Sequence, residues 1–278
     1  MKKRKESLAA YPYLVWSIIF IVVPLLLIVF YSFTVNDNGT IKFSLENYKR
    51  LLDPLYLKVF GRSIYLALAS TFICLIVGYP VAYIIAKMKF STRNVLILLF
   101  ILPMWMNFLL RTYAWMAILG RNGVINSILS ALGFNGLNLL YNEGAVMLGM
   151  VYNFLPFMVL PIYTVLIKID KNLINASYDL GANQVQTFFK VILPLSMPGV
   201  TSGITMAFMP AVSTFVISRL LGGGKTTLVG NIIEQQFTTL GDWHFGSALS
   251  IFMMLLILIC MALMTRYDGN SSKKGGAK

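Results

Sequence analysis

Six apolar stretches without a charged residue constrain the fold of this chain more than any other feature. They are 17 to 28 residues long and lie at 11–35, 63–86, 94–110, 144–167, 191–218 and 245–265. A helix needs about 20 mostly apolar residues to cross a bilayer, because each residue rises roughly 1.5 Å through a hydrocarbon layer roughly 30 Å thick. The sequence therefore predicts an all-α membrane protein with six transmembrane helices, the third of which is the shortest.

The composition agrees with this fold class. Of the 278 residues, 58% are hydrophobic and 12% are charged, whereas an ordinary soluble domain carries roughly 25% charged residues. The net charge of +13 could suggest nucleic acid, but the basic residues lie between apolar stretches rather than in one patch of a folded surface. We therefore expect no nucleic acid partner and expect the charge to set the membrane topology.

The lysines and arginines of the loops indicate the orientation. With six spans both termini share a side, which receives fourteen basic residues, against eight on the other side. Because cytoplasmic loops are the more basic ones, both termini are expected in the cytoplasm. Arg111 follows the third stretch directly and is expected to extend to the far interface.

These spans and loops divide the chain into five parts. The parts are a cytoplasmic N-terminus at 1–10, a first transmembrane helix at 11–35, an outside loop at 36–62, a core of five transmembrane helices at 63–267 that includes a cytoplasmic loop at 168–195, and a cytoplasmic tail at 268–278.

A short helix within the outer loop at 116–143 is expected to lie on the membrane surface, because its apolar residues share one face.

The sequence contains no set of residues typical of a catalytic or metal centre. His244 is the only histidine, no span contains an acid, and Cys74 and Cys260 lie within apolar stretches. The GGGKTT segment resembles a phosphate-binding loop, but the first glycine of that pattern is replaced by Arg219. We therefore expect that this chain is no enzyme and binds neither a metal nor a cofactor.

The loop at 168–195 has a helical order of its own. Leu173, Ala176 and Leu180 follow a helical spacing that would end at Gly181. A capping box formed by Asn183 and Gln186 would then begin a second helix. Its apolar residues before Pro194 share one face, namely Val185, Phe188, Phe189 and Ile192. An amphipathic hairpin of this kind suits both lipid headgroups and a groove on another protein, and the residues alone leave both alternatives open.

The spacing of this loop resembles the EAA loop of ABC-importer permeases, whose pattern is Glu-Ala-Ala, three residues, Gly-Ala, and then Phe and Leu-Pro. The chain departs from it at Asn175 and Ser177, where the family usually has glutamate and alanine. Further stretches at 111–115, 120–126, 153–163, 220–233 and 242–246 resemble the spermidine/putrescine branch of the family. The positions that carry the EAA resemblance are Asn175, Ala176, Ser177, Gly181, Ala182, Phe188, Leu193 and Pro194.

The resemblance implies a type I ABC-importer permease in a bacterial inner or plasma membrane. It would form half of the pathway of an ATP-driven importer of spermidine and putrescine. Its implied partners are a second homologous permease, two ATPase subunits that bind ATP and magnesium, an extracytoplasmic polyamine-binding protein and the membrane lipid. The residues implied to couple it to the ATPase are Asn175, Ala176, Ser177, Asp179, Leu180, Gly181, Ala182, Phe188 and Pro194.

A pathway for a polyamine should offer aromatic faces and a few carboxylates, because the solute is a flexible polycation. Since the spans contain no acid, the candidates lie near their outer ends, where tryptophan and tyrosine also serve as membrane anchors. Asp242 and Trp243 are the first candidates. The others are Tyr113, Trp115, Tyr152, Glu234 and Glu143.

Two alternatives to polyamine import remain open. A permease of the same architecture could carry another amine, an opine-like compound or ferric ion, and a membrane scaffold would carry nothing. The glycines Gly199 and Gly203 also allow two interpretations, since their spacing permits close helix packing either within this subunit or against the second permease.

Overall fold

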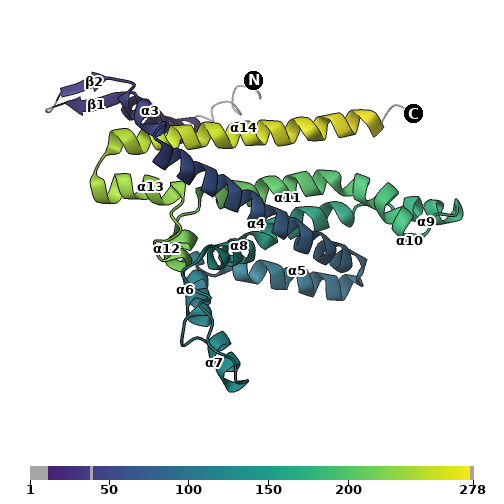
Figure 1. The fold of residues 1–278 in the computed structure, drawn as a ribbon. Helices are drawn as coiled ribbons and strands as arrows, with labels where there is room; N and C mark the ends of the chain where they lie inside the picture. The colour runs from purple at the N-terminus through teal and green to yellow at the C-terminus, as the bar shows by residue number, and fades with distance from the viewer. Residues whose placement is uncertain (1–11, 38–39, 276–278) are drawn as a thin grey trace, which may run out of the picture. The chain divides into compact units, whose positions relative to one another are not determined.

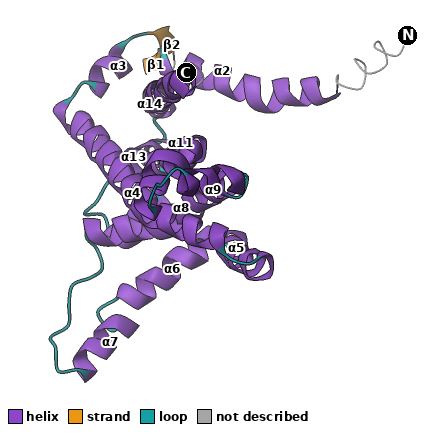
Figure 2. Ribbon diagram, turned by 90° about the vertical axis from the view of Figure 1, so that its right-hand side faces the viewer, coloured by secondary structure: helices purple, strands orange, loops and turns teal. Residues whose placement is uncertain are grey.

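The computed structural model describes residues 12–37 and 40–275, which are almost entirely helical apart from one β-hairpin (Figures 1 and 2). The expected N-terminal segment at 1–10 therefore lies outside the described residues. The chain divides into two compact units, one made of Met1–Val59 and Ile232–Leu256 and the other of Phe60–Asn231 and Ile257–Lys278.

The smaller unit contains the first membrane helix and a β-hairpin. Its helix Pro12–Ser32 includes the π-helix η1 (Ile18–Val22) and α2 (Val23–Ser32). The strands β1 (Thr34–Asp37) and β2 (Thr40–Phe43) pair in antiparallel fashion and precede α3 (Glu46–Leu51). The imidazole Nδ1 of His244 lies 2.9 Å from the Thr34 hydroxyl, which links the end of the first helix to the start of α14 (Trp243–Gly275).

The larger unit begins within α4 (Pro54–Lys87) and contains most of the remaining helices. Those up to the loop at 168–195 are α5 (Phe90–Trp105), α6 (Phe108–Leu119), α7 (Val124–Ala131) and α8 (Glu143–Leu166). Those after it are α11 (Leu193–Ser213) and α12 (Val216–Gly222), followed by α13 (Val229–Gln235) and η3 (Gln236–Leu240), which lead into the smaller unit.

The core of the larger unit is the contact between α8 and α11, which lie side by side in Figure 1. A Cβ added at Gly199 would lie 2.9 Å from the carbonyl oxygen of Pro161, and one at Gly203 would lie 2.9 Å from Sδ of Met158. The two glycines therefore allow close packing of α11 on α8. Of the two interpretations of their spacing, the structure thus supports packing within this subunit.

Among the described residues, five helices are long and apolar enough to cross a membrane, and the count rises to six if the bent pair Phe90–Trp105 and Phe108–Ala131 is one span. This pair corrects the expectation of a continuous third span at 94–110, because its two parts differ in direction by 95°. Met106 is extended at the break, and the side chain of Asn107 accepts a hydrogen bond from the Leu109 amide and caps α6. A polar cap within an apolar stretch ends one helix and begins another.

Arg111 is a second correction. It is buried rather than extended away from the protein, and it lies in the first turn of α6 with 9% of its surface exposed. Its guanidinium lies 5.8 Å from the centre of the Phe108 ring, and its Nε has no hydrogen-bond partner among the described residues. The break at Asn107 moves Arg111 from the end of one helix to the start of another, which explains the error.

The fifth span also differs from the expected range of 191–218. The helix that begins at Gln184 continues through Pro194 and ends at Ser213, after which Thr214 is extended. Pro194 has no N–H, and the π-helix η2 (Phe188–Ile192) directly before it supplies the altered hydrogen bonding that a proline within a helix needs. The same arrangement occurs in the first span, where η1 precedes Pro24.

Candidate functional site

The loop at 168–195 forms the helical corner that its spacing predicts. The helix α9 (Lys171–Asp179) ends at Leu180, and Gly181 follows with a φ of +86°, in the left-handed region that favours glycine. The Gly181 amide donates to the Tyr178 carbonyl at 2.8 Å, and the Ala182 amide donates to the Ser177 carbonyl at 3.0 Å. These two bonds define a Schellman motif, which ends the helix and turns the chain sharply.

The second helix of the corner starts on the expected capping box. The Asn183 side chain accepts from the Gln186 amide at 2.8 Å, and the Gln186 side chain accepts from the Asn183 amide at 3.0 Å. The helix α10 (Gln184–Thr187) then continues into η2 and α11. The corner is therefore joined to the membrane helix without an intervening loop.

A buried pair of hydroxyl groups holds the two short helices together. The Ser177 hydroxyl lies 2.9 Å from the Thr187 hydroxyl, and it also donates to the Ile174 carbonyl at 2.7 Å. Ser177 and Thr187 are 9% and 1% exposed, respectively. Serine at a position where the EAA pattern usually has alanine is thus a structural contact. The sequence reasoning missed Thr187, which carries no recognisable signal by itself.

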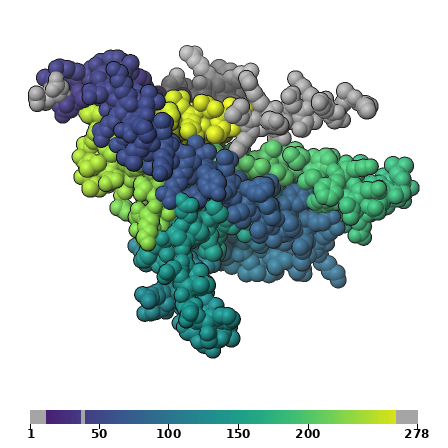
Figure 3. Space-filling view, viewed as in Figure 1, coloured from purple at the N-terminus to yellow at the C-terminus, as the bar shows by residue number. Residues whose placement is uncertain are grey.

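Large apolar side chains are exposed on the corner, which is drawn in green at the right of Figure 3. Leu180 at its tip is 89% exposed, and Val185 and Phe189 are 63% and 60% exposed. Asn175, Ala176 and Asp179 are exposed on α9 as well. We define the exposed side chains of α9, of α10 and of Phe189 on η2, together with the Gly181 turn, as the corner surface.

Phe188 belongs to the attachment of the corner rather than to its exposed surface. Its ring makes edge contacts with Tyr79 at 5.7 Å and with Tyr83 at 5.3 Å, both on α4. The Tyr79 hydroxyl lies 2.8 Å from the Ser196 hydroxyl on α11, and both groups are buried. These contacts join the corner to α4, and α4 to α11.

Of the expected pathway residues, the structure places one pair in contact. The rings of Trp115 on α6 and Tyr152 on α8 meet edge to face at 5.3 Å. Tyr113 is 46% exposed on α6. Asp242, Trp243 and Glu234 belong to the other compact unit.

The outer carboxylates have structural partners. Asp242 forms an ion pair with Arg50 at 3.1 Å and accepts a hydrogen bond from the Phe245 amide, so that it caps α14. Trp243 beside it is 55% exposed and contacts Phe237. Glu143 at the start of α8 forms an ion pair with Arg62. Two of the three outer acids thus join helices.

Asn153 on α8 is a polar residue in a span that the sequence reasoning did not select. It is 2% exposed, and its amide donates to the Gly149 carbonyl at 2.8 Å. Its Oδ1 has no hydrogen-bond partner in the part of the chain that the structure describes. The only signal in the sequence was an asparagine within an otherwise apolar stretch, which is costly unless it is used.

The helices, the capped corner and the bent third span together define a membrane permease of the ABC-importer class. Residues 78–270 match the family described as "Binding-protein-dependent transport system inner membrane component", and the chain belongs to this family. The matched range includes the complete corner.

Curated relatives cover nearly the whole chain. The chain is 39% identical over 264 residues to the spermidine/putrescine transport system permease protein PotB of Escherichia coli (strain K12). The alignment covers 93% of this chain and 96% of that relative. The chain is 40% identical over 260 residues to the protein of the same name from Haemophilus influenzae, with 92% and 90% covered.

The fold has close counterparts among solved structures. A chain from the crystal structure of a bacterial ABC transporter involved in the import of the acidic polysaccharide alginate aligns with a TM-score of 0.82 at 16% identity, covering 99% of this chain and 98% of that chain. A chain from the alginate transporter in complex with an alginate pentasaccharide-bound periplasmic protein aligns with a TM-score of 0.78 at 15% identity, covering 94% and 93%. At these identities the likeness concerns the fold alone.

Proposed function

We propose that this chain is the transmembrane permease subunit of an ATP-driven importer of spermidine and putrescine and forms half of the translocation pathway. The observation that carries the proposal is the identity of 39% over 93% of the chain to a permease named for these two solutes. Conserved length supports it too, because 96% of that relative is covered.

The proposed assembly contains a second homologous permease, two ATPase subunits and an extracytoplasmic polyamine-binding protein. A solved transporter with the same fold was captured with a periplasmic protein, which supports delivery of the solute by such a partner. ATP and magnesium would be bound by the ATPase subunits.

The corner surface is proposed to dock in the ATPase. Its exposed leucine, valine and phenylalanine side chains suit an apolar groove on another protein, and Asp179 at its edge suits a basic partner. The capping box and the Schellman motif make the corner rigid, and its second helix continues into α11. A displacement of the docked corner would therefore move membrane helices as rigid bodies, as alternating access requires.

On the solute side, the Trp115–Tyr152 pair is the proposed aromatic contact for a polycation. A cation near an aromatic ring gains about 0.5–2 kcal/mol, depending on how far it is desolvated. Tyr113, Trp243 and Glu234 remain candidate contacts. Asp242 remains one as well, although it also caps α14 and pairs with Arg50.

Uptake by whole cells tests the choice of solute. The chain and its partner subunits would be produced in cells that lack their own polyamine importers, and uptake of labelled spermidine and putrescine would be compared with uptake of labelled arginine and ferric ion. We expect spermidine or putrescine uptake only. Uptake of a competing solute without either polyamine would overturn the proposal.

A further inference from the structure

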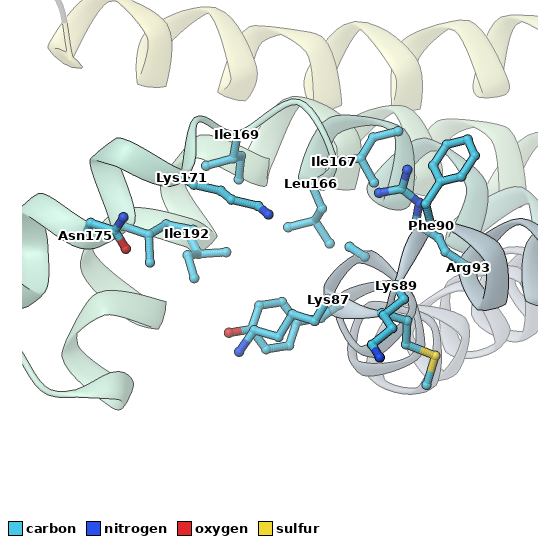
Figure 4. Close-up of a pocket in the computed structure, with 14 residues that line it drawn as sticks. Lys87, Lys89, Phe90, Arg93, Leu166, Ile167, Ile169, Lys171, Asn175 and Ile192 are labelled. Carbon is cyan, nitrogen blue, oxygen red and sulfur yellow. The ribbon is translucent and has the colours of Figure 1, made fainter.

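A cavity of about 610 Å³ lies beside the corner, between the α4–α5 connection and the start of α9 (Figure 4). Four of its lining residues are cationic, and none of the residues that line it is a carboxylate. Asn175 of the corner surface lines the same cavity. The cations are Lys87, Lys89, Arg93 and Lys171.

Three of the four cations occupy helix positions that normally favour acids, whereas Lys87 lies in the last turn of α4. Lys89 is the N-cap of α5, Arg93 follows within the first turns of that helix, and Lys171 is the first residue of α9. A helix N-terminus carries a partial positive charge, so that cations there raise the electrostatic energy and an anion lowers it. Neither helix has an acid in its first turn. The nearest capping carboxylate is that of Asp170, which accepts a hydrogen bond from the Asn172 amide.

The cationic side chains of the cavity offer hydrogen-bond donors to a ligand. The Nε of Arg93 is buried and has no hydrogen-bond partner among the described residues, although its guanidinium lies 5.2 Å from the centre of the Phe90 ring. A buried donor without an acceptor costs free energy. The Lys87 ammonium lies 4.2 Å from the centre of the Tyr83 ring. In Figure 4 Lys171 and Arg93 approach the open middle of the cavity from opposite sides.

We propose that this cavity binds a phosphate group. Phosphate supplies the acceptors that a guanidinium and three ammonium groups need, and arginine can bind it with two parallel hydrogen bonds. The positive-inside bias explains why cations occur at the ends of α4 and α5, but it does not explain why four of them converge on one cavity.

The source of the phosphate that best fits the lining is an anionic phospholipid. The cavity is also lined by apolar side chains such as those of Phe90, Ile167 and Ile169. It lies where the apolar helix α4 ends and the apolar helix α5 begins. Basic pockets between membrane helices at this level suit lipid headgroups. Because Asn175 lines it, a bound headgroup would contact the corner that is proposed to dock in the ATPase. The inference does not depend on which solute is transported.

Binding to the purified full-length chain tests this inference. Native mass spectrometry would compare phosphatidylglycerol, phosphatidylcholine and inorganic phosphate as ligands. The test variant combines Lys89→Gln, Arg93→Gln and Lys171→Gln, and the matched control combines Lys168→Gln and Lys190→Gln, two exposed lysines outside the lining. Asn175→Glu is a second test variant, which places a carboxylate in the lining at an exposed position.

We expect saturable binding of one phosphatidylglycerol that is weakened about a hundredfold in the triple variant, since each of the three cations contributes about fivefold. Asn175→Glu should also weaken binding, and the lysine control should not. Saturable binding of inorganic phosphate with no preference for phosphatidylglycerol would support the phosphate site with a soluble source. Equal binding of phosphatidylcholine would overturn the preference for an anionic lipid, and binding unchanged in both test variants would overturn the phosphate site itself.

Discussion

At the scale of single residues, Asp242 shows how a position that looks functional in the sequence can have a structural role. Its carboxylate caps α14 through the Phe245 amide and pairs with Arg50, which lies 192 residues earlier in the chain. The exposed ion pair contributes little, whereas an N-cap contributes about 1 kcal/mol. The cap is therefore the larger of the two contributions.

This difference predicts that Asp242→Ala lowers the free energy of unfolding by about 1 kcal/mol and that Asp242→Asn, which keeps the cap, costs much less. Thermal unfolding of the purified chain measures both variants. If Asp242→Asn were as stable as the wild type but failed to transport spermidine, the carboxylate would have a role in the pathway after all.

Gly181 is the residue on which the corner depends. Its φ of +86° is disfavoured for residues with a Cβ by about 1–2 kcal/mol, while no atom lies within 4 Å of the position that a Cβ would occupy. Gly181→Leu should therefore distort the corner without a steric clash. Most of the transport and of its coupling to ATP hydrolysis should be lost, while the chain still inserts into the membrane.

Gly181→Asn is the matched variant, since asparagine tolerates a left-handed conformation better than leucine does. Gly181→Asn should retain more uptake of labelled spermidine than Gly181→Leu when both variants are measured in vesicles that contain the reconstituted complex. Uptake by Gly181→Leu equal to that of the wild type would show that the corner does not transmit ATPase movement.

At the scale of elements, the packing of α11 on α8 gives a second comparison of glycines. A Cβ at Gly199 would lie 2.9 Å from the Pro161 carbonyl oxygen, whereas one at Gly61 on α4 would meet no atom within 4 Å. Gly199→Ala should destabilise the chain. Gly61→Ala should be neutral or should stabilise it by up to about 1 kcal/mol, because alanine favours a helix.

Thermal unfolding of the two variants in one detergent would measure this difference. Equal melting temperatures would mean that α11 and α8 do not pack as closely as the structure has them.

The elements also show what the sequence could predict. The corner was predictable because its signals are local, namely the glycine after the last helical turn and the asparagine and glutamine three residues apart. The apolar runs likewise predicted the helices α4, α8 and α14. The break at Asn107 was not predicted, because one capping side chain within an apolar run changes the composition very little.

The sequence did not predict the contacts between residues of different helices. The pairing of Asp242 with Arg50, the contact of Ser177 with Thr187 and the burial of Arg111 depend on which helices pack together. The candidate pathway residues were chosen by residue type alone. That criterion selected Trp115 and Tyr152, whose rings lie in contact, and did not select Asn153, whose Oδ1 has no hydrogen-bond partner among the described residues.

At the scale of the whole molecule, a permease whose ATPase is a separate subunit must receive its driving force through contact with that subunit. The chain belongs to the family of binding-protein-dependent inner membrane components, and its corner is joined directly to α11. The cytoplasmic position of both termini follows from the loop charges and remains a prediction. Transport by this chain should therefore depend on an intact ATPase and on the binding protein.

The most direct test of this account is the uptake of labelled spermidine by vesicles that contain the reconstituted complex of both permeases and two ATPase subunits, with the binding protein added outside. The account predicts accumulation when ATP is enclosed in the vesicles and none when a non-hydrolysable ATP analogue replaces it. Equal accumulation with ATP and with the analogue, or no spermidine uptake while ATP is hydrolysed and another solute enters, would contradict it.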